Sequence, residues 1–153
     1  AQRLLRRSAF QPGAPYSRTR PRRTEGSPLN IEKTRTFYDR ITLRDLCSCA
    51  YCQNYIQGIR AAYPEAAEYL AGLGVDIEKP LETLPLEPDS LGFLEYAGAQ
   101  YIVLGTPDGF TKTTVGSVLV DMAGAHPPTA LEEAHFVIEL SPIRLKWKAR
   151  GGA

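Results

Sequence analysis

The helix-favouring patterns of this 153-residue chain lie almost entirely before residue 81, and the clearest strand-favouring patterns follow it. No helical segment separates the later strands, although parallel strands would need such a crossover. This order predicts an α+β fold, with a helix pair packed on one face of an antiparallel sheet of four to six strands. We expect residues 31–148 to form a single domain with one core, and residues 149–153 to be frayed.

Two helices are predicted between residues 45 and 74. Asp45 is the expected N-cap of the first, in which apolar residues recur at helical spacing from Cys52 to Tyr63. Pro64 suits the start of the second helix, "PEAAEYLAGLG", which ends at its glycines. Upstream of both, the β-branched run "TRTFYDRITL" predicts a short strand. Its burial candidates are Phe37, Ile41 and Leu43.

The second half of the chain has a period of two and many turn residues. "FLEYA" and "QYIVLG" are predicted strands joined by a hairpin turn at Ala97 to Ala99, and "PDG" at 107–109 is a further turn. "TTVGSVLVDM", "AHFVIELS" and "IRLKWKA" predict one strand each, with Pro142 between the last two. Alternation in "AHFVIELS" places Phe136 inward and Val137 outward.

Charge is distributed unevenly along the chain. Residues 1–30 contain seven arginines and one acid, Glu25, so the remaining 123 residues hold 11 of the 18 basic and 16 of the 17 acidic residues. We expect this Arg-rich tail to be disordered, because it holds few large apolar residues. An acidic body is a poor nucleic-acid platform, so a nucleic acid or a protein partner would have to bind through residues 1–30. A transit-peptide remnant, an assembly arm and a plain exposed tail are alternatives that stay open.

No apolar run approaches the roughly 18 residues of a membrane span, which predicts a soluble protein without a membrane partner. The cysteines form one cluster of three and are not spread as a disulfide framework would be. Such a cluster favours a reducing compartment, and we expect the cytoplasm.

That cluster, "CSCAYCQNY" at 47–55, contains every cysteine of the chain. Cys47, Cys49 and Cys52 could ligate Zn²⁺, with His126 of the "GAHPPT" loop as the fourth ligand and His135 or an acid as alternatives. A second hypothesis makes Cys49 and Cys52 the thiols of a thiol–disulfide oxidoreductase, at a helix start that lowers a thiol pKa. In a third, Cys52 packs as a small buried hydrophobe and the other two are inert.

The sequence gives little support for other kinds of catalytic site. Cys47 or Cys49 with His126 would form a nucleophile–base pair, but no family signature frames it. The adjacent acids Glu132 and Glu133 would point to opposite faces of a strand, and the glycines form no phosphate-binding motif. We therefore favour a small non-enzymatic domain of unknown cellular role, whose thiol cluster is structural or binds metal.

The run from about Asp45 to Asp76 resembles an uncharacterised bacterial protein family. The resemblance is carried by C-x-x-C-x-N-[FY], followed by a proline and "LGVD" at 73–76, with "HFVIELSP" as a fainter match. The motif positions are Cys49, Cys52, Asn54, Tyr55 and Pro64. The resemblance covers about a third of the chain and implies that the cysteines and Asn54 act as a unit, without naming a reaction.

Overall fold

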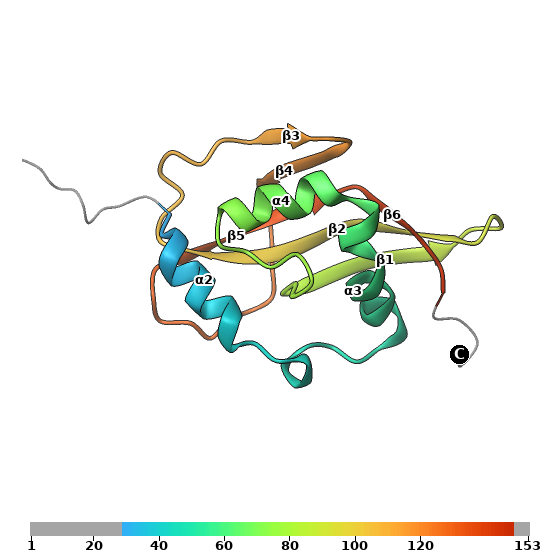
Figure 1. Ribbon diagram of the computed structural model, residues 1–153, viewed down its shortest axis with the longest axis horizontal. Coiled ribbons are helices and arrows are strands. Elements are labelled where there is room, and N and C mark those ends of the chain that lie inside the picture. Colours follow the sequence, from blue (N-terminus) through green and yellow to red (C-terminus); the bar gives the residue numbers. More distant parts are fainter. Residues whose placement is uncertain (1–28, 149–153) are drawn as a thin grey trace, which may run out of the picture.

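The computed structural model describes residues 29–148, and the elements follow the predicted order of helices first and strands later (Figure 1). The helices are α2 (Ile31–Arg40), the 3₁₀ helix η3 (Leu43–Asp45), α3 (Ala50–Ala62) and α4 (Pro64–Gly72). The strands are β1 (Glu82–Pro88), β2 (Phe93–Leu104), β3 (Thr113–Val115), β4 (Val118–Met122), β5 (His135–Ser141) and β6 (Ile143–Lys146). Residues 1–28 of the Arg-rich tail, and residues 149–153, lie outside the described residues.

The strands form one six-stranded antiparallel sheet in the order β1-β2-β5-β4-β3, and β6 also pairs with β2. β5 and β6 pair with successive parts of β2, on either side of Pro142, whose peptide bond with Ser141 is cis. The prediction of an α+β fold with an antiparallel sheet of four to six strands is confirmed.

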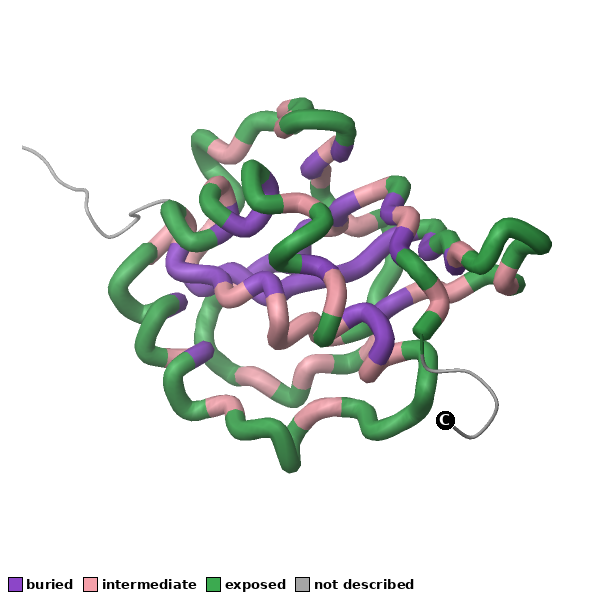
Figure 2. The backbone as a smooth tube through the Cα atoms, turned by 45° about the vertical axis from the view of Figure 1, so that its right-hand side comes forward, coloured by how far each residue is buried: buried purple, intermediate pink, exposed green. Residues whose placement is uncertain are grey.

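The main core lies between the helices and one face of this sheet. Tyr55, Ile59 and Leu70 of α3 and α4 are fully buried against Tyr96 and Tyr101 of β2, and Figure 2 shows the buried positions gathered along the central strands. A smaller cluster is formed by Ile102, Leu104 and Val137. Ala123 and Leu131, from the loop between β4 and β5, pack against it. Val137, predicted to face outward, is therefore buried as well.

The strand predicted in "TRTFYDRITL" is wrong, because these residues form most of α2 and the segment after it. Asn30 caps α2 by accepting a hydrogen bond from the Lys33 amide at 2.9 Å, and the buried residues are Thr34 and Tyr38, one helical turn apart. The β-branched residues suggested a strand, but burial at i and i+4 selected a helix. Leu43, predicted to be buried, is 78% exposed.

The hairpin turn predicted at Ala97 to Ala99 is also wrong, because β2 runs without a break from Phe93 to Leu104. Gly98 instead makes room for a neighbouring side chain, since a Cβ there would lie 2.8 Å from a carboxylate oxygen of Glu139. Conversely, "TTVGSVLVDM" contains two strands, since Gly116 turns the chain between β3 and β4 with a φ of +62°. The "PDG" turn is confirmed by a bond from the Phe110 amide to the Pro107 carbonyl.

Helix side chains bond to backbone groups along two edges of the sheet, one of which is the part of β2 that runs past Gln100, where its pairing with β1 ends. Beside β2, the Tyr38 hydroxyl donates to the Ile102 carbonyl at 2.8 Å and accepts from the Ile102 amide at 2.9 Å. Beside β6, the Tyr63 hydroxyl accepts from the Arg144 amide at 3.0 Å and donates to the Arg144 carbonyl at 3.3 Å. These tyrosines take the place of a neighbouring strand, so the edges are covered.

None of the helices within residues 29–148 is long and apolar enough to cross a membrane.

Candidate metal centre

The cysteines lie where the chain enters α3, and local hydrogen bonds hold this entry. Asp45, the predicted N-cap of the helix, instead closes the preceding η3, because its carboxylate accepts from the Thr42 amide at 2.8 Å. The N-cap of α3 is Cys49, whose sulfur accepts from the Cys52 amide at 3.4 Å. The Gln53 side chain donates to the Cys47 carbonyl at 2.8 Å and so holds the upstream cysteine against the helix.

This arrangement brings the sulfurs of Cys47, Cys49 and Cys52 within 4.8 Å of one another. Zn–S bonds of about 2.3 Å in a tetrahedral site place sulfurs about 3.8 Å apart, so a movement of about 1 Å would suffice for a common metal. Cys47 and Cys49 are exposed, whereas Cys52 is half-buried against β1, where its sulfur lies 3.4 Å from the Thr83 hydroxyl. The half-burial of Cys52 is compatible with the packing hypothesis, which assigns no packing role to the exposed Cys47 and Cys49.

The two thiols of the C-x-x-C pair differ in acidity. Burial opposes ionisation of Cys49, but bonds from the Cys52 and Tyr51 amides and from the neighbouring thiols lower its pKa overall. Burial is the main reason that the pKa of Cys52 rises to about 12, and the nearby Cys47 and Cys49 add to this rise. A metal cation near the three sulfurs would favour the thiolate form of all of them.

A small pocket of about 60 Å³ adjoins the thiols, between the start of α3 and β1. Cys47 and Cys52 line it together with Thr83 and the acids Asp45 and Glu82. Neither acid belongs to the group of close ligand atoms. Since one water needs roughly 12 Å³ of such volume, the pocket could hold a few waters but no organic cofactor.

The structure does not bring His126 into the thiol group. Its Nδ1 lies 2.8 Å from the Pro127 carbonyl, and the neighbouring Ala125 carbonyl accepts a bond from Gln100 in β2. His135, the first residue of β5, bonds to the preceding loop: its ring nitrogens lie 2.7 Å from the Thr129 hydroxyl and 2.7 Å from the Glu133 carbonyl. Among residues 29–148, the close ligand group therefore contains three thiols and no imidazole.

Asn54 and Tyr55, which complete the C-x-x-C-x-N-[FY] segment, are buried and bonded within the fold. The Asn54 amide donates to the Lys146 carbonyl at 2.9 Å and accepts from the Lys148 amide at 2.8 Å, which holds the end of β6. The Tyr55 and Tyr101 hydroxyls are 2.5 Å apart in the core. These residues fix α3 on the sheet, and the cysteines lie at the exposed start of the same helix.

Sequence reasoning missed the partners of the thiols. Thr83 lies 31 residues from Cys52, and no short-range pattern connects them. Gln53 could have been noticed, because it lies within the cysteine segment and glutamine side chains often bond to nearby carbonyls.

No protein-family model matches the chain, and no curated protein or solved structure matches it significantly. The functional argument therefore depends on the residues themselves.

Proposed function

We propose that the chain binds one soft divalent metal ion, zinc being the cellular candidate, through the thiolates of Cys47, Cys49 and Cys52. The observation that carries the proposal is the approach of the three sulfurs within 4.8 Å of one another at the start of α3. Thiolate ligands favour zinc and copper(I) over the hard cations magnesium and calcium.

The fourth coordination position goes to a water molecule from the small pocket beside Cys47 and Cys52. A zinc site with three protein ligands and one water leaves one position exchangeable, unlike a closed four-cysteine structural site. This arrangement competes with the prediction that His126 is the fourth ligand, which would require the loop after β4 to reach the thiols.

Zinc affinity tests the proposal and separates these two arrangements. Full-length protein, purified without chelator or affinity tag, should contain about one zinc per chain. In competition with a chromophoric chelator, Cys47→Ser, Cys49→Ser and Cys52→Ser should each weaken binding by about 100-fold or more, because each removes a ligand. His126→Ala is the control and should leave the affinity within about twofold; a large loss there would make His126 a ligand. Affinity unchanged in all three cysteine variants would refute the proposal.

A second candidate function is thiol–disulfide exchange. It is favoured by the position of Cys49 at the N-cap of α3, with Cys52 three residues later in the helix. The exposed Cys49 thiolate would attack a substrate disulfide, forming a mixed disulfide and releasing one substrate thiolate. Cys52 would then lose its proton and attack the Cys49 sulfur, forming a Cys49–Cys52 disulfide and releasing the second substrate thiolate. Two electrons pass to the substrate.

The role of Cys47 distinguishes the two functions. Exchange needs only Cys49 and Cys52, so Cys47→Ser should still reduce a disulfide substrate, although it would lose metal affinity. Mass spectrometry after treatment with oxidised glutathione should show the Cys49–Cys52 bond in that variant. Absence of the bond and of substrate reduction, in metal-free protein, would exclude this second function.

A further inference from the structure

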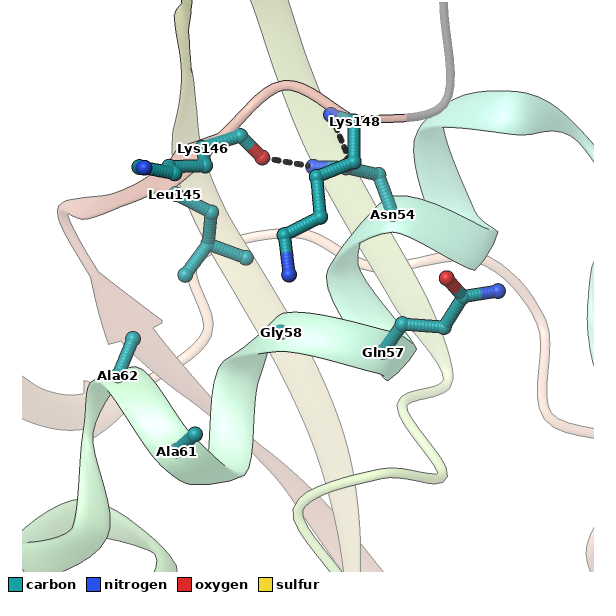
Figure 3. Close-up of a pocket in the computed structure, with 8 residues that line it drawn as sticks. All are labelled: Asn54, Gln57, Gly58, Ala61, Ala62, Leu145, Lys146 and Lys148. Carbon is teal, nitrogen blue, oxygen red and sulfur yellow. Dashed lines mark hydrogen bonds between the residues drawn. The ribbon is translucent and has the colours of Figure 1, made fainter. Parts of the chain in front are cut away.

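A separate pocket of about 260 Å³ lies between α3 and the end of β6 (Figure 3). It shares no lining residue with the thiol pocket. Its helical side is formed by positions of α3 that recur every three or four residues, and its other side by the chain from Leu145 onward. The lining residues are Asn54, Gln57, Gly58, Ala61, Ala62, Leu145, Lys146 and Lys148.

The charged side chains that line this pocket are both lysines. Lys146 and Lys148 are exposed, and neither forms an ion pair with a carboxylate of the described part of the chain. No Asp or Glu of residues 29–148 lines the pocket, and α3 itself contains no acid. Figure 3 shows the Lys148 side chain extending over α3 between Leu145 and Gln57. A body in which acids outnumber bases thus presents a local site of positive charge.

The glycine at position 58 is a second feature that indicates a binding site here. It lies in the middle of α3, where glycine is among the least favourable residues. A Cβ at this position would meet only Leu145, at 3.7 Å and 4.0 Å, which are ordinary contact distances. Packing therefore does not require glycine here. The missing side chain does leave room between the helix and Leu145, within the pocket.

The pocket wall is already ordered by bonds within the fold. Asn54 bonds to the Lys146 carbonyl and the Lys148 amide, so the backbone that bears both lysines is held against α3 (Figure 3). A ligand would have to order only the lysine side chains, which lowers the entropic cost of binding.

We propose that this pocket binds a small organic carboxylate, whose apolar chain lies on Gly58, Ala61 and Leu145 and whose carboxylate pairs with Lys148. The volume is below that of drug-sized sites, which fits a short apolar chain and one charged group. This site is independent of the metal-binding proposal, since it shares no lining residue with the thiol pocket.

The probe is octanoate, and its binding to the full-length protein is monitored by ¹H–¹⁵N NMR. Two matched controls are acetate, which has the carboxylate without the long chain, and octanol, which has the chain without the charge. Octanoate should shift the amides of Gly58, Ala61 and Lys148, with a Kd of about 1 mM or tighter. Acetate and octanol should each bind at least about tenfold more weakly. Octanol binding equal to that of octanoate, or no shift with octanoate, would overturn the proposal. So would a stronger response to an acidic peptide at the same residues.

Variants of the pocket give a second readout. Gly58→Leu fills the space beside Leu145 and should abolish octanoate binding, and Lys148→Glu should weaken it by about tenfold or more. Gly58→Ala should raise Tm by about 4 °C and weaken binding, because the helix gains stability while the pocket loses volume. Gly72→Ala and Lys112→Glu, which lie outside the pocket, are the controls and should bind octanoate as the parent protein does. Full binding by well-folded Gly58→Leu protein would contradict the proposed location.

Discussion

The edges of the sheet and the start of α3 use polar side chains in opposite ways. At the edges, the hydroxyls of Tyr38 and Tyr63 and the amide of Asn54 bond to backbone groups of β2 and of the chain from Arg144 to Lys148. At the start of α3, the exposed thiols of Cys47 and Cys49 lie close to each other and to Cys52. The first set completes the fold. The second set is held by bonds such as those from the Cys52 amide to the Cys49 sulfur and from the Gln53 side chain to the Cys47 carbonyl. Two of its three thiols are nevertheless exposed to solvent.

The largest loss of stability is expected at high pH, because the buried tyrosine hydroxyls would have to ionise there. Burial raises the pKa of Tyr38, Tyr55 and Tyr101 well above the ordinary value, and that of Tyr96 to about 12. A folded-state pKa above the unfolded one stabilises the fold below about pH 10 and loses that contribution as pH rises toward the folded pKa.

The free energy of unfolding should therefore fall steeply between about pH 10 and pH 12. Urea unfolding at a series of pH values measures it, and tyrosinate absorbance should rise together with loss of structure. Ionisation of every tyrosine while the protein stays folded would contradict this account of the edges and core.

The next largest effect is expected for Tyr38→Phe, which leaves the amide and carbonyl of Ile102 without their bonds. The loss should be about 3 kcal/mol, because both groups lie in the interior. Tyr63→Phe removes the corresponding bonds to Arg144, but at a less buried edge with a 3.3 Å contact, and should cost about 1 kcal/mol. Denaturant unfolding of metal-free protein checks both. Equal small losses would show that the edges do not depend on these hydroxyls.

The smallest effect on folding is expected for Cys47→Ser and Cys49→Ser. Both side chains are exposed, so the free energy of unfolding of metal-free protein should change by less than about 0.5 kcal/mol. With zinc present, the parent protein should be stabilised and these variants should not. A large loss in metal-free protein would instead make the exposed thiols structural, which would remove the distinction between the two regions.

The fold class could be predicted because local patterns are unambiguous in parts of the chain. Pro64 was predicted to start a helix and is the first residue of α4. The alternation around Phe136 predicted a strand, which is β5. The prediction was wrong where tertiary packing contributed: Thr34 and Tyr38, one helical turn apart, both bond to backbone groups of β2. Gly98 marks a close approach to Glu139 and not a turn. Such choices depend on strands far away in sequence.

The candidate site was predictable to the extent that its ligands are adjacent in sequence. The spacing of Cys47, Cys49 and Cys52 already suggested a metal, and the structure brings their sulfurs together. The pocket beside them is formed partly by β1, which lies next to α3 only in the folded chain. Nothing in the sequence around Thr83 indicates that it lies beside a thiol. The pocket at Gly58 was missed for the same reason, since Leu145 and Lys148 come from the other end of the chain.

Titration of metal-free protein with Cd²⁺ tests the central claim most directly, because thiolate-to-metal charge transfer reports how many sulfurs bind each ion. The account predicts saturation at one equivalent, with a band whose intensity corresponds to three thiolates and falls by about a third in each single cysteine-to-serine variant. No break at one equivalent, or a band unchanged when one of the cysteines is replaced, would show that the three sulfurs do not form one site.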